Sequence, residues 1–443
     1  MTREARSESR AVWTPMLALV ACLIGAACAA QKPPLSPTAL SATIDTLATR
    51  GDSTGLATLA HRQCRSDSTE VRRTCLEDFF VGLAANGRTG MALGALAQLG
   101  KAHEDVEREG HGYTHVIGIR AWQPGDDVAN VFRGCNGLYQ SGCYHGVIQS
   151  YLTAEGTLDS TRAVTLCDAV ASDVKELWLR FQCVHGLGHG FEMALNWELP
   201  AALTRCDWLA NGWDRQACYG GAFMENAIAS MSGGHHHVSV RALEKASEAN
   251  AAADHSAHGG MAGMNHAPAL GAITFKMRDS TDALYPCSAT EPKYRSACYQ
   301  LQGGIILANT GGRFGLATAA CDKVGSQWRS YCYQSLGTNA SGMAVQKNSK
   351  AIAYCTNGDP DYQPYCFVGV VKNYIDVTAK PADGIAFCKD VPPGKNRTQC
   401  FVAVGEQIVV LFPTDVPKRE ALCSEAGLDG VADCRRGAAL PPK

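Results

Sequence analysis

The chain has 443 residues, and its 40 Lys and Arg against 42 Asp and Glu give a formal net charge of -2 at pH 7. A charge so close to balance provides no overall basic field, which argues against a nucleic-acid-binding protein. The length allows two or three ordinary domains or one array of repeats. The 20 cysteines are far more than a reduced cytosolic protein carries, so they indicate an oxidising compartment.

The N-terminal segment predicts export. Several arginines precede an apolar run from residue 16 to residue 27, and small residues follow, which is the order of a secretory signal. The run is too short for a comfortable membrane span. We therefore expect a signal peptide over residues 1–30 and an extended tether over residues 31–40. The sequence "GAAC" resembles a bacterial lipobox ending at Cys28, which implies a lipid-anchored periplasmic or cell-surface protein; cleavage near Ala30 would instead give a secreted one.

The other 18 cysteines fall into nine consecutive couples. In the last five couples the first cysteine recurs every 33 to 35 residues, which is the period of a two-helix repeat. Segments such as "YRSACYQLQGGIILA" and "WRSYCYQSLGTNASG" align without gaps on their second cysteine. We expect one disulfide in each couple, although spacing alone also permits other connectivities. The couples are Cys64 with Cys75, Cys135 with Cys143, Cys167 with Cys183, Cys206 with Cys218, Cys287 with Cys298, Cys321 with Cys332, Cys355 with Cys366, Cys388 with Cys400 and Cys423 with Cys434.

Each unit is predicted to contain a helix that ends in a cysteine, a polar turn, and a second helix that carries the other cysteine. A helix pair cannot bury its apolar face alone, so neighbouring pairs must stack. The predicted fold is therefore all-α, a solenoid of about eight or nine disulfide-stapled helix-turn-helix repeats. We place helical repeats over residues 41–230 and 271–443. Over about residues 160–440, the period and helix pairing resemble cysteine-rich helical-repeat proteins related to tetratricopeptide arrays, a resemblance that implies architecture and no functional residue.

Histidines occupy equivalent positions in two adjacent repeats. Positions two and six residues after the second cysteine lie on one face of the second helix, because residues four apart are neighbours there. These positions hold His145 in one repeat and both His185 and His189 in the next. Stacked helices lie about 8–10 Å apart, so such imidazoles can reach a shared ion. Upstream, "EGHGYTHVIGIRAW" adds a second pair four apart, His111 and His115.

These residues predict a metal site, since paired histidines one helical turn apart present two nitrogens to an ion. Glu192 and Glu225 are the candidate carboxylates, either as metal partners, as groups that orient an imidazole, or as ordinary helix-face charges. The glycines around the histidines allow close approach of a ligand or dense helix packing. The histidines would otherwise be hydrogen-bonded core residues. The predicted ligands are His111, His115, His145, His185, His189 and Glu225.

Residues 231–270 interrupt the repeat period and are rich in histidine, methionine, glycine and alanine. Imidazole and thioether ligands together suit copper, and the tract resembles the Met/His-rich segments of exported bacterial copper-handling proteins. Zinc or nickel would also bind such a tract, and the alternative is a flexible polar loop that binds nothing. The predicted accessory metal ligands are His235, His236, His237, His255, His258, Met261, Met264 and His266.

Motifs of known catalysis are absent from the sequence, which lacks His-Glu-x-x-His, Cys-x-x-Cys, a phosphate-binding loop and Gly-x-Ser-x-Gly. The sequence therefore predicts an exported transition-metal-binding protein, with copper favoured over zinc or iron and with catalysis left open. The alternative is an α-solenoid scaffold that binds a peptide or a partner protein on its concave face without metal. That alternative is favoured by the later repeats, which carry Gln, Thr, Lys and Val in place of the histidines. Non-covalent haem held by a histidine pair is a third possibility.

Overall fold

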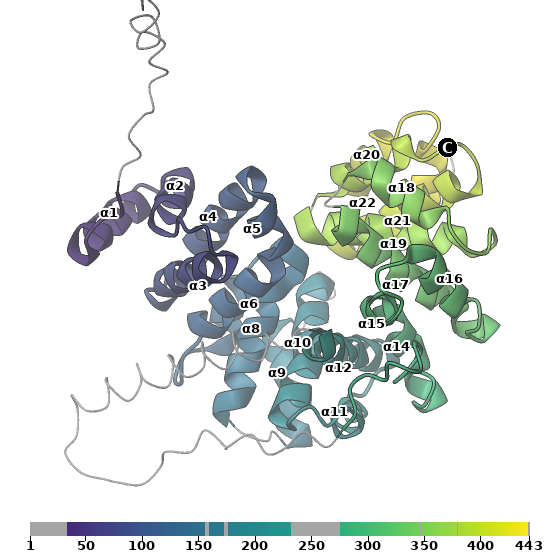
Figure 1. Cartoon of the computed structure of the whole chain (residues 1–443), viewed down its shortest axis with the longest axis horizontal. Helices are drawn as coiled ribbons and strands as arrows, with labels where there is room; N and C mark the ends of the chain where they lie inside the picture. The colour runs from purple at the N-terminus through teal and green to yellow at the C-terminus, as the bar shows by residue number, and fades with distance from the viewer. Residues whose placement is uncertain are drawn as a thin grey trace, which may run out of the picture.

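The computed structural model describes most of the chain, and every regular element in the described residues is helical (Figure 1). These residues contain 22 α-helices and one short 3-10 helix, η2. The predicted signal peptide, Cys28 and the predicted accessory ligands lie outside them. The structure describes residues 33–155, 159–171, 176–231, 275–344, 347–378 and 380–441.

The helices before the insertion are α1 (Pro37–Thr49), α2 (Ser53–Gln63), α3 (Thr69–Ala85), α4 (Thr89–Ala102), α5 (Glu104–Arg108), α6 (Gly110–Ala121), α7 (Val128–Arg133), α8 (Leu138–Glu155), α9 (Ser160–Val170), α10 (Leu177–Ala194), α11 (Leu199–Cys206) and α12 (Gly212–Met231). Those after it are η2 (Pro292–Tyr294), α14 (Arg295–Leu301), α15 (Gly303–Asn309), α16 (Phe314–Cys321), α17 (Ser326–Ala344), α18 (Asn348–Cys355), α19 (Gln363–Thr378), α20 (Pro381–Asp390), α21 (Lys395–Leu411), α22 (Val416–Ser424) and α23 (Val431–Gly437).

All nine predicted disulfides are present, with Cα–Cα distances between 5.3 and 5.6 Å. Every cysteine of the nine couples has the partner that the spacing predicted. The bonds join Cys64 to Cys75, Cys135 to Cys143, Cys167 to Cys183, Cys206 to Cys218, Cys287 to Cys298, Cys321 to Cys332, Cys355 to Cys366, Cys388 to Cys400 and Cys423 to Cys434.

These bonds staple the two helices of a repeat together. In the unit formed by α16 and α17, Cys321 ends the first helix and Cys332 lies in the second. Closing a loop of this length stabilises the fold by about 3 kcal/mol in the loop-entropy account. The stapled helix pairs confirm the predicted all-α repeat architecture.

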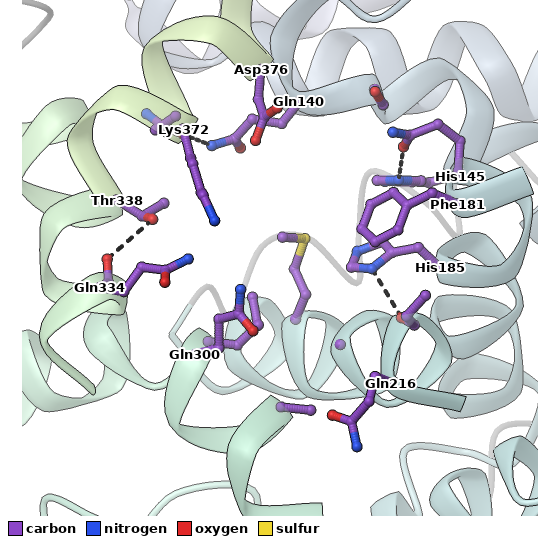
Figure 2. Close-up of a pocket in the computed structure, with 18 of the residues that line it drawn as sticks. Gln140, His145, Phe181, His185, Gln216, Gln300, Gln334, Thr338, Lys372 and Asp376 are labelled. Carbon is purple, nitrogen blue, oxygen red and sulfur yellow. Dashed lines mark hydrogen bonds between the residues drawn. The ribbon is translucent and has the colours of Figure 1, made fainter. Parts of the chain in front are cut away.

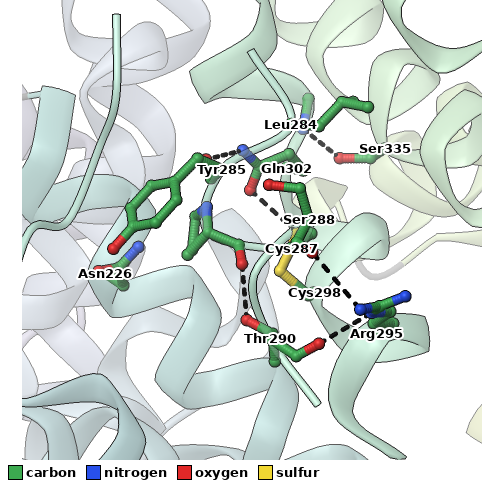
Figure 3. Close-up of a disulfide and its surroundings, with 12 residues drawn as sticks. Asn226, Leu284, Tyr285, Cys287, Ser288, Thr290, Arg295, Cys298, Gln302 and Ser335 are labelled. Carbon is green, nitrogen blue, oxygen red and sulfur yellow. Dashed lines mark hydrogen bonds between the residues drawn. A yellow bond between two sulfur atoms is a disulfide. The ribbon is translucent and has the colours of Figure 1, made fainter. Parts of the chain in front are cut away.

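The staple at Cys287 departs most from the predicted pattern, because Cys287 lies in a run of turns; Cys135 also lies outside a helix, two residues after the end of α7. Figure 3 shows how side chains hold this turn beside Cys298. The Gln302 carboxamide donates to the Tyr285 carbonyl at 2.6 Å, and Arg295 donates to the Thr290 carbonyl at 2.8 Å. These side-chain hydrogen bonds add to the turn's own backbone hydrogen bonds, such as the one from the Ser288 N–H to the Leu284 carbonyl at 3.0 Å.

Several helices begin at residues suited to that position. The carboxylates of Asp52, Asp127 and Asp159 accept backbone N–H bonds in the first turns of α2, α7 and α9. Each such cap contributes about 1 kcal/mol. Pro381 opens α20, where a missing N–H costs nothing. The first described helix, α1, starts at Pro37.

The longer second helices pack against one another through glycines. A Cβ added at Gly146 of α8 would overlap the backbone carbonyl of His115 in α6, and one at Gly221 of α12 would overlap the carbonyl of His185 in α10. Only residues without a side chain allow backbones this close. These glycines therefore serve close helix packing: Gly146 lets the histidine-bearing helices α6 and α8 approach, and Gly221 lets α12 approach α10.

The helical array curves far enough for distant repeats to touch. The Gln140 carboxamide at the start of α8 donates to Asn373 of α19, and Asn373 donates to Ser341 of α17 at 2.7 Å. Lys347 and Glu104 form an ion pair of 3.4 Å between the same two regions. Figure 1 shows the curvature from the purple N-terminal helices through the teal ones to the yellow C-terminal ones. Among the described helices, none is long and apolar enough to cross a bilayer.

Candidate metal centre

The five predicted histidines stand on three helices that pack side by side. His111 and His115 lie on α6, His145 on α8, and His185 and His189 on α10. The ring centroids of His111 and His145 are 5.8 Å apart, and those of His115 and His189 are 6.1 Å apart. The structure thus brings all five imidazoles into one cluster.

Three of these histidines form the tightest group, which we call the triad: His145, His185 and His189. Their ring centroids are 4.8 to 5.1 Å apart, and one ring nitrogen from each lies within 4.8 Å of the others. Their exposed fractions are 2%, 6% and 0%. A group of three buried imidazoles at this spacing could hold a metal ion. His111 and His115 are half-buried and flank the triad.

Hydrogen bonds hold one nitrogen of each triad ring and leave the other available. Nδ1 of His185 donates to the Ala217 carbonyl at 3.1 Å. Nε2 of His145 lies 3.3 Å from the carboxamide oxygen of Gln182. Within the described residues, Nδ1 of His145 and Nε2 of His189 have no hydrogen-bond partner although both are buried. Buried polar atoms normally find a partner, and a metal ion would satisfy both nitrogens.

Glu225 of α12 lies behind His189. Its carboxylate is 3.0 Å from Nδ1 of His189 and accepts a hydrogen bond of 3.3 Å from the Trp197 indole. A carboxylate in this place fixes the ring orientation and directs Nε2 away from itself. The structure therefore supports the orienting role that the sequence left open for Glu225. Its role as a direct ligand stays a prediction.

Glu192, the other candidate carboxylate, is fully buried on α10. Neither of its carboxylate oxygens has a hydrogen-bond partner within the described residues. Burial, with the nearby charges of Glu225 and Glu198, raises the pKa of Glu192 well above its usual value. Glu192 is outside the triad's group of ligand atoms.

Burial keeps His145 and His185 in the protonation state that a metal requires. It lowers the pKa of His145 and of His185 well below the usual histidine value, and the neighbouring imidazoles lower both further. A positive charge on any of these rings would be poorly solvated and close to another ring. The two imidazoles are therefore neutral near pH 7, and only the neutral ring coordinates a metal.

The chain at the start of α8 is strained next to His111. Tyr139, Gln140 and Ser141 have φ angles of 49°, 57° and 63°, in the left-handed region. That conformation costs non-glycine residues roughly 1–2 kcal/mol each, and such strain concentrates at functional sites. Here it presents the Tyr139 carbonyl to Nδ1 of His111 at 2.8 Å. Sequence reasoning missed this turn, because it contains no glycine or asparagine to signal it.

A cavity of about 270 Å³ opens beside the triad (Figure 2). His145 and His185 lie on one wall, and Gln300, Gln334 and Lys372 extend toward them from the opposite side. Sequence reasoning also missed Gln182, which lies on the same wall and directly precedes the repeat's second cysteine. Its place directly before the repeat's second cysteine was the sequence signal that could have identified Gln182.

Comparison of the chain with protein-family models, with curated proteins and with solved structures finds no match. The resemblance to tetratricopeptide-related proteins therefore rests on the helical, disulfide-stapled architecture alone.

Proposed function

We propose that this protein binds a transition metal ion at the triad of His145, His185 and His189, with copper as the preferred metal. One observation carries the proposal: three buried imidazoles from two helices place one nitrogen each within 4.8 Å of the others. The hydrogen bonds on the far side of each ring resemble those that orient metal-bound histidines in general.

The ligand chemistry favours copper over harder metals. The triad offers imidazole nitrogens alone, a donor set that suits copper and zinc, whereas magnesium, calcium and manganese prefer oxygen. Among divalent ions the same donors bind copper most tightly. Tetrahedral coordination at about 2.0–2.1 Å requires nitrogens about 3.3 Å apart, so the rings must approach one another slightly when the ion enters.

His111 and His115 extend the site. Their rings are 6.0 Å apart, and His115 lies 6.5 Å from His145. We infer that this pair forms a second, weaker position through which an ion reaches the triad. Being half-buried, the pair exchanges ions with solvent more readily than the triad does. Residues 231–270, which precede the C-terminal repeats, would serve as the outer collector.

The disulfides place the protein in an oxidising, extracytoplasmic compartment. A lipid at Cys28 would hold it at a membrane surface there. Binding and delivery of copper require no feature beyond these ligands and this location. Catalysis would require an open coordination position, and the cavity beside His185 provides access for a substrate.

X-ray absorption spectroscopy of the protein loaded with one equivalent of copper tests the proposal. We expect three nitrogen scatterers with the outer-ring pattern of imidazole and no sulfur scatterer. A spectrum dominated by sulfur would place copper on methionines, and one dominated by oxygen would place it on surface carboxylates. Either spectrum would refute the triad as the copper site.

A further inference from the structure

The cavity beside the triad is built from the same face of successive repeats. Positions two and six residues after the second cysteine supply His145, His185, Gln300, Gln334 and Lys372, all of which line it. The later repeats therefore keep a common inward face although they carry no histidine there. Contact between α8 and α19 closes the array around this space.

Aromatic rings form one wall of the cavity. The ring centroid of Phe181 lies 5.5 Å from that of His185 and 5.7 Å from that of Trp213. Trp178 stacks near Phe181, with a centroid distance of 6.4 Å. Trp213 is 42% exposed, which is a large apolar surface to leave in contact with water. Flat aromatic faces next to polar groups are typical of ligand pockets.

Uncharged amides dominate the polar part of the lining. Gln300 and Gln334 point into the cavity (Figure 2), and neither side chain has a hydrogen-bond partner within the described residues. Each carboxamide offers two donor hydrogens and one acceptor oxygen. Asn373 and Thr338 add further polar groups to the same lining.

Few charged side chains line the described cavity. Lys372 and Asp376 are its charged residues, and Lys372 also pairs with Glu406 at 3.2 Å. Arginine, which binds phosphate or carboxylate with two parallel hydrogen bonds, is absent from the described lining. The cavity therefore suits a neutral molecule that has both an apolar face and several hydroxyl groups.

We propose that the cavity is a binding site for a small neutral saccharide of one or two rings. The C–H face of a sugar ring would stack on Trp213 and Phe181, while its hydroxyl groups exchange hydrogen bonds with Gln300 and Gln334. The volume of about 270 Å³ lies just below the usual range for ligand pockets and is small for an extended peptide. Binding of the sugar to the metal-free protein does not depend on the proposed metal site.

Isothermal titration calorimetry on the metal-free, disulfide-intact full chain tests this inference. The probes are glucose, galactose, N-acetylglucosamine and maltose, with trialanine as the peptide arm. We expect at least one saccharide to bind with a dissociation constant below about 1 mM, which corresponds to a binding free energy of roughly -4 kcal/mol. We also expect its binding to change the tryptophan fluorescence and trialanine to give no heat.

Two variants locate the binding, and two controls match them. Trp213→Ala and Gln334→Ala should each weaken saccharide binding about tenfold, by loss of the stacking face and of a hydrogen-bonding group. Tyr331→Ala and Gln327→Ala, at exposed positions of α17 outside the cavity lining, should leave it unchanged. Circular dichroism verifies that all four variants are folded.

Three results would overturn the inference. The first is no heat from any of the four saccharides at about 10 mM, a concentration well above the expected dissociation constant. The others are saccharide binding that is weakened equally in the control variants, and binding of trialanine in place of sugar. Metal binding is measured in separate titrations. A protein that binds sugar and no copper would refute the metal proposal alone, and the reverse result would refute the saccharide site alone.

Discussion

Glu225 determines which nitrogen of His189 faces the other two triad rings. Its carboxylate holds Nδ1, so Nε2 remains as the donor atom toward His145 and His185. The Trp197 indole occupies the second carboxylate oxygen and restricts rotation of the group. A single acidic side chain therefore sets both the tautomer and the orientation of one proposed ligand.

The Glu225→Gln variant should bind copper about tenfold to a hundredfold more weakly, because the negative charge behind the imidazole is lost while the volume is kept. Competition with a chromophoric copper chelator measures this affinity. Glu70→Gln, at an exposed position in the first turn of α3, is the matched control and should bind as the unaltered chain does. Equal affinity in both variants would show that Glu225 does not act on the metal.

Asp376 gives the protein a pH dependence of stability that is separate from the triad. Burial raises its pKa to about 7, while Lys372 and a 3.0 Å hydrogen bond from Gln407 act in the opposite direction. The unfolded carboxyl has a pKa of about 3.9. Between these values the folded state binds the extra proton, so its stability falls as pH rises from about 4 to about 7.

Asp376→Asn removes this titration. Between about pH 4.5 and about pH 8, the unaltered chain should lose at least about 2 kcal/mol of unfolding free energy through this titration, and the variant should not show that loss. Urea denaturation of both proteins at the two pH values, with metal absent, gives the comparison. A difference in stability that is the same at both pH values would contradict the raised pKa.

At the scale of helices, close glycine contacts set the spacing of the histidines. α6 and α8 touch at Gly146, and α8 and α10 approach at Gly186, where an added Cβ would lie 3.2 Å from the Ile148 side chain. Helix axes usually lie about 8–10 Å apart, at a distance that depends on the side chains at the contact. Glycine at these points lets the helices approach more closely than larger residues would. The imidazoles can therefore converge without long side chains to bridge a gap.

Gly146→Ala should destabilise the protein by about 2 kcal/mol, because the added methyl group must displace the His115 carbonyl. Gly82→Ala in α3, where a Cβ would meet no atom within 4 Å, should instead stabilise it by about 0.5–1 kcal/mol. Chemical denaturation measures both. A Gly146→Ala protein as stable as the Gly82→Ala protein would mean that α6 and α8 do not touch at this point.

For the whole molecule, the sequence was sufficient to predict what repeats. The nine cysteine couples predicted the connectivity, and their period predicted the helix pairs. Counting from the second cysteine, Cys143 or Cys183, also placed His145 and His185 on one inward face, since that count depends on helical periodicity alone. The site's common face was therefore predictable from local spacing.

Features that depend on curvature or on exact packing were not predictable. Gln140 and Asn373 meet across the array because small rotations between repeats add up over a long stretch of chain. The left-handed turn at residues 139–141 contains no glycine or asparagine to signal it, and its residues make hydrogen bonds with Glu107, His111 and Asn373, which lie far away in the sequence. The turn that carries Cys287 was not predictable either: the cysteine keeps the repeat period, but the helix expected before it does not form.

The metal content of the untagged full chain tests the central claim most directly. Copper and zinc would be measured after dialysis for the unaltered protein, for the double variant His185→Asn with His189→Asn, and for the control His61→Asn with His103→Asn, which alters another stacked histidine pair with a 4.3 Å ring separation. Metal held by residues 232–274 contributes equally to all three. We expect the triad variant to lose about one equivalent of copper and the control to lose none. Equal copper content in the two variants would contradict the account.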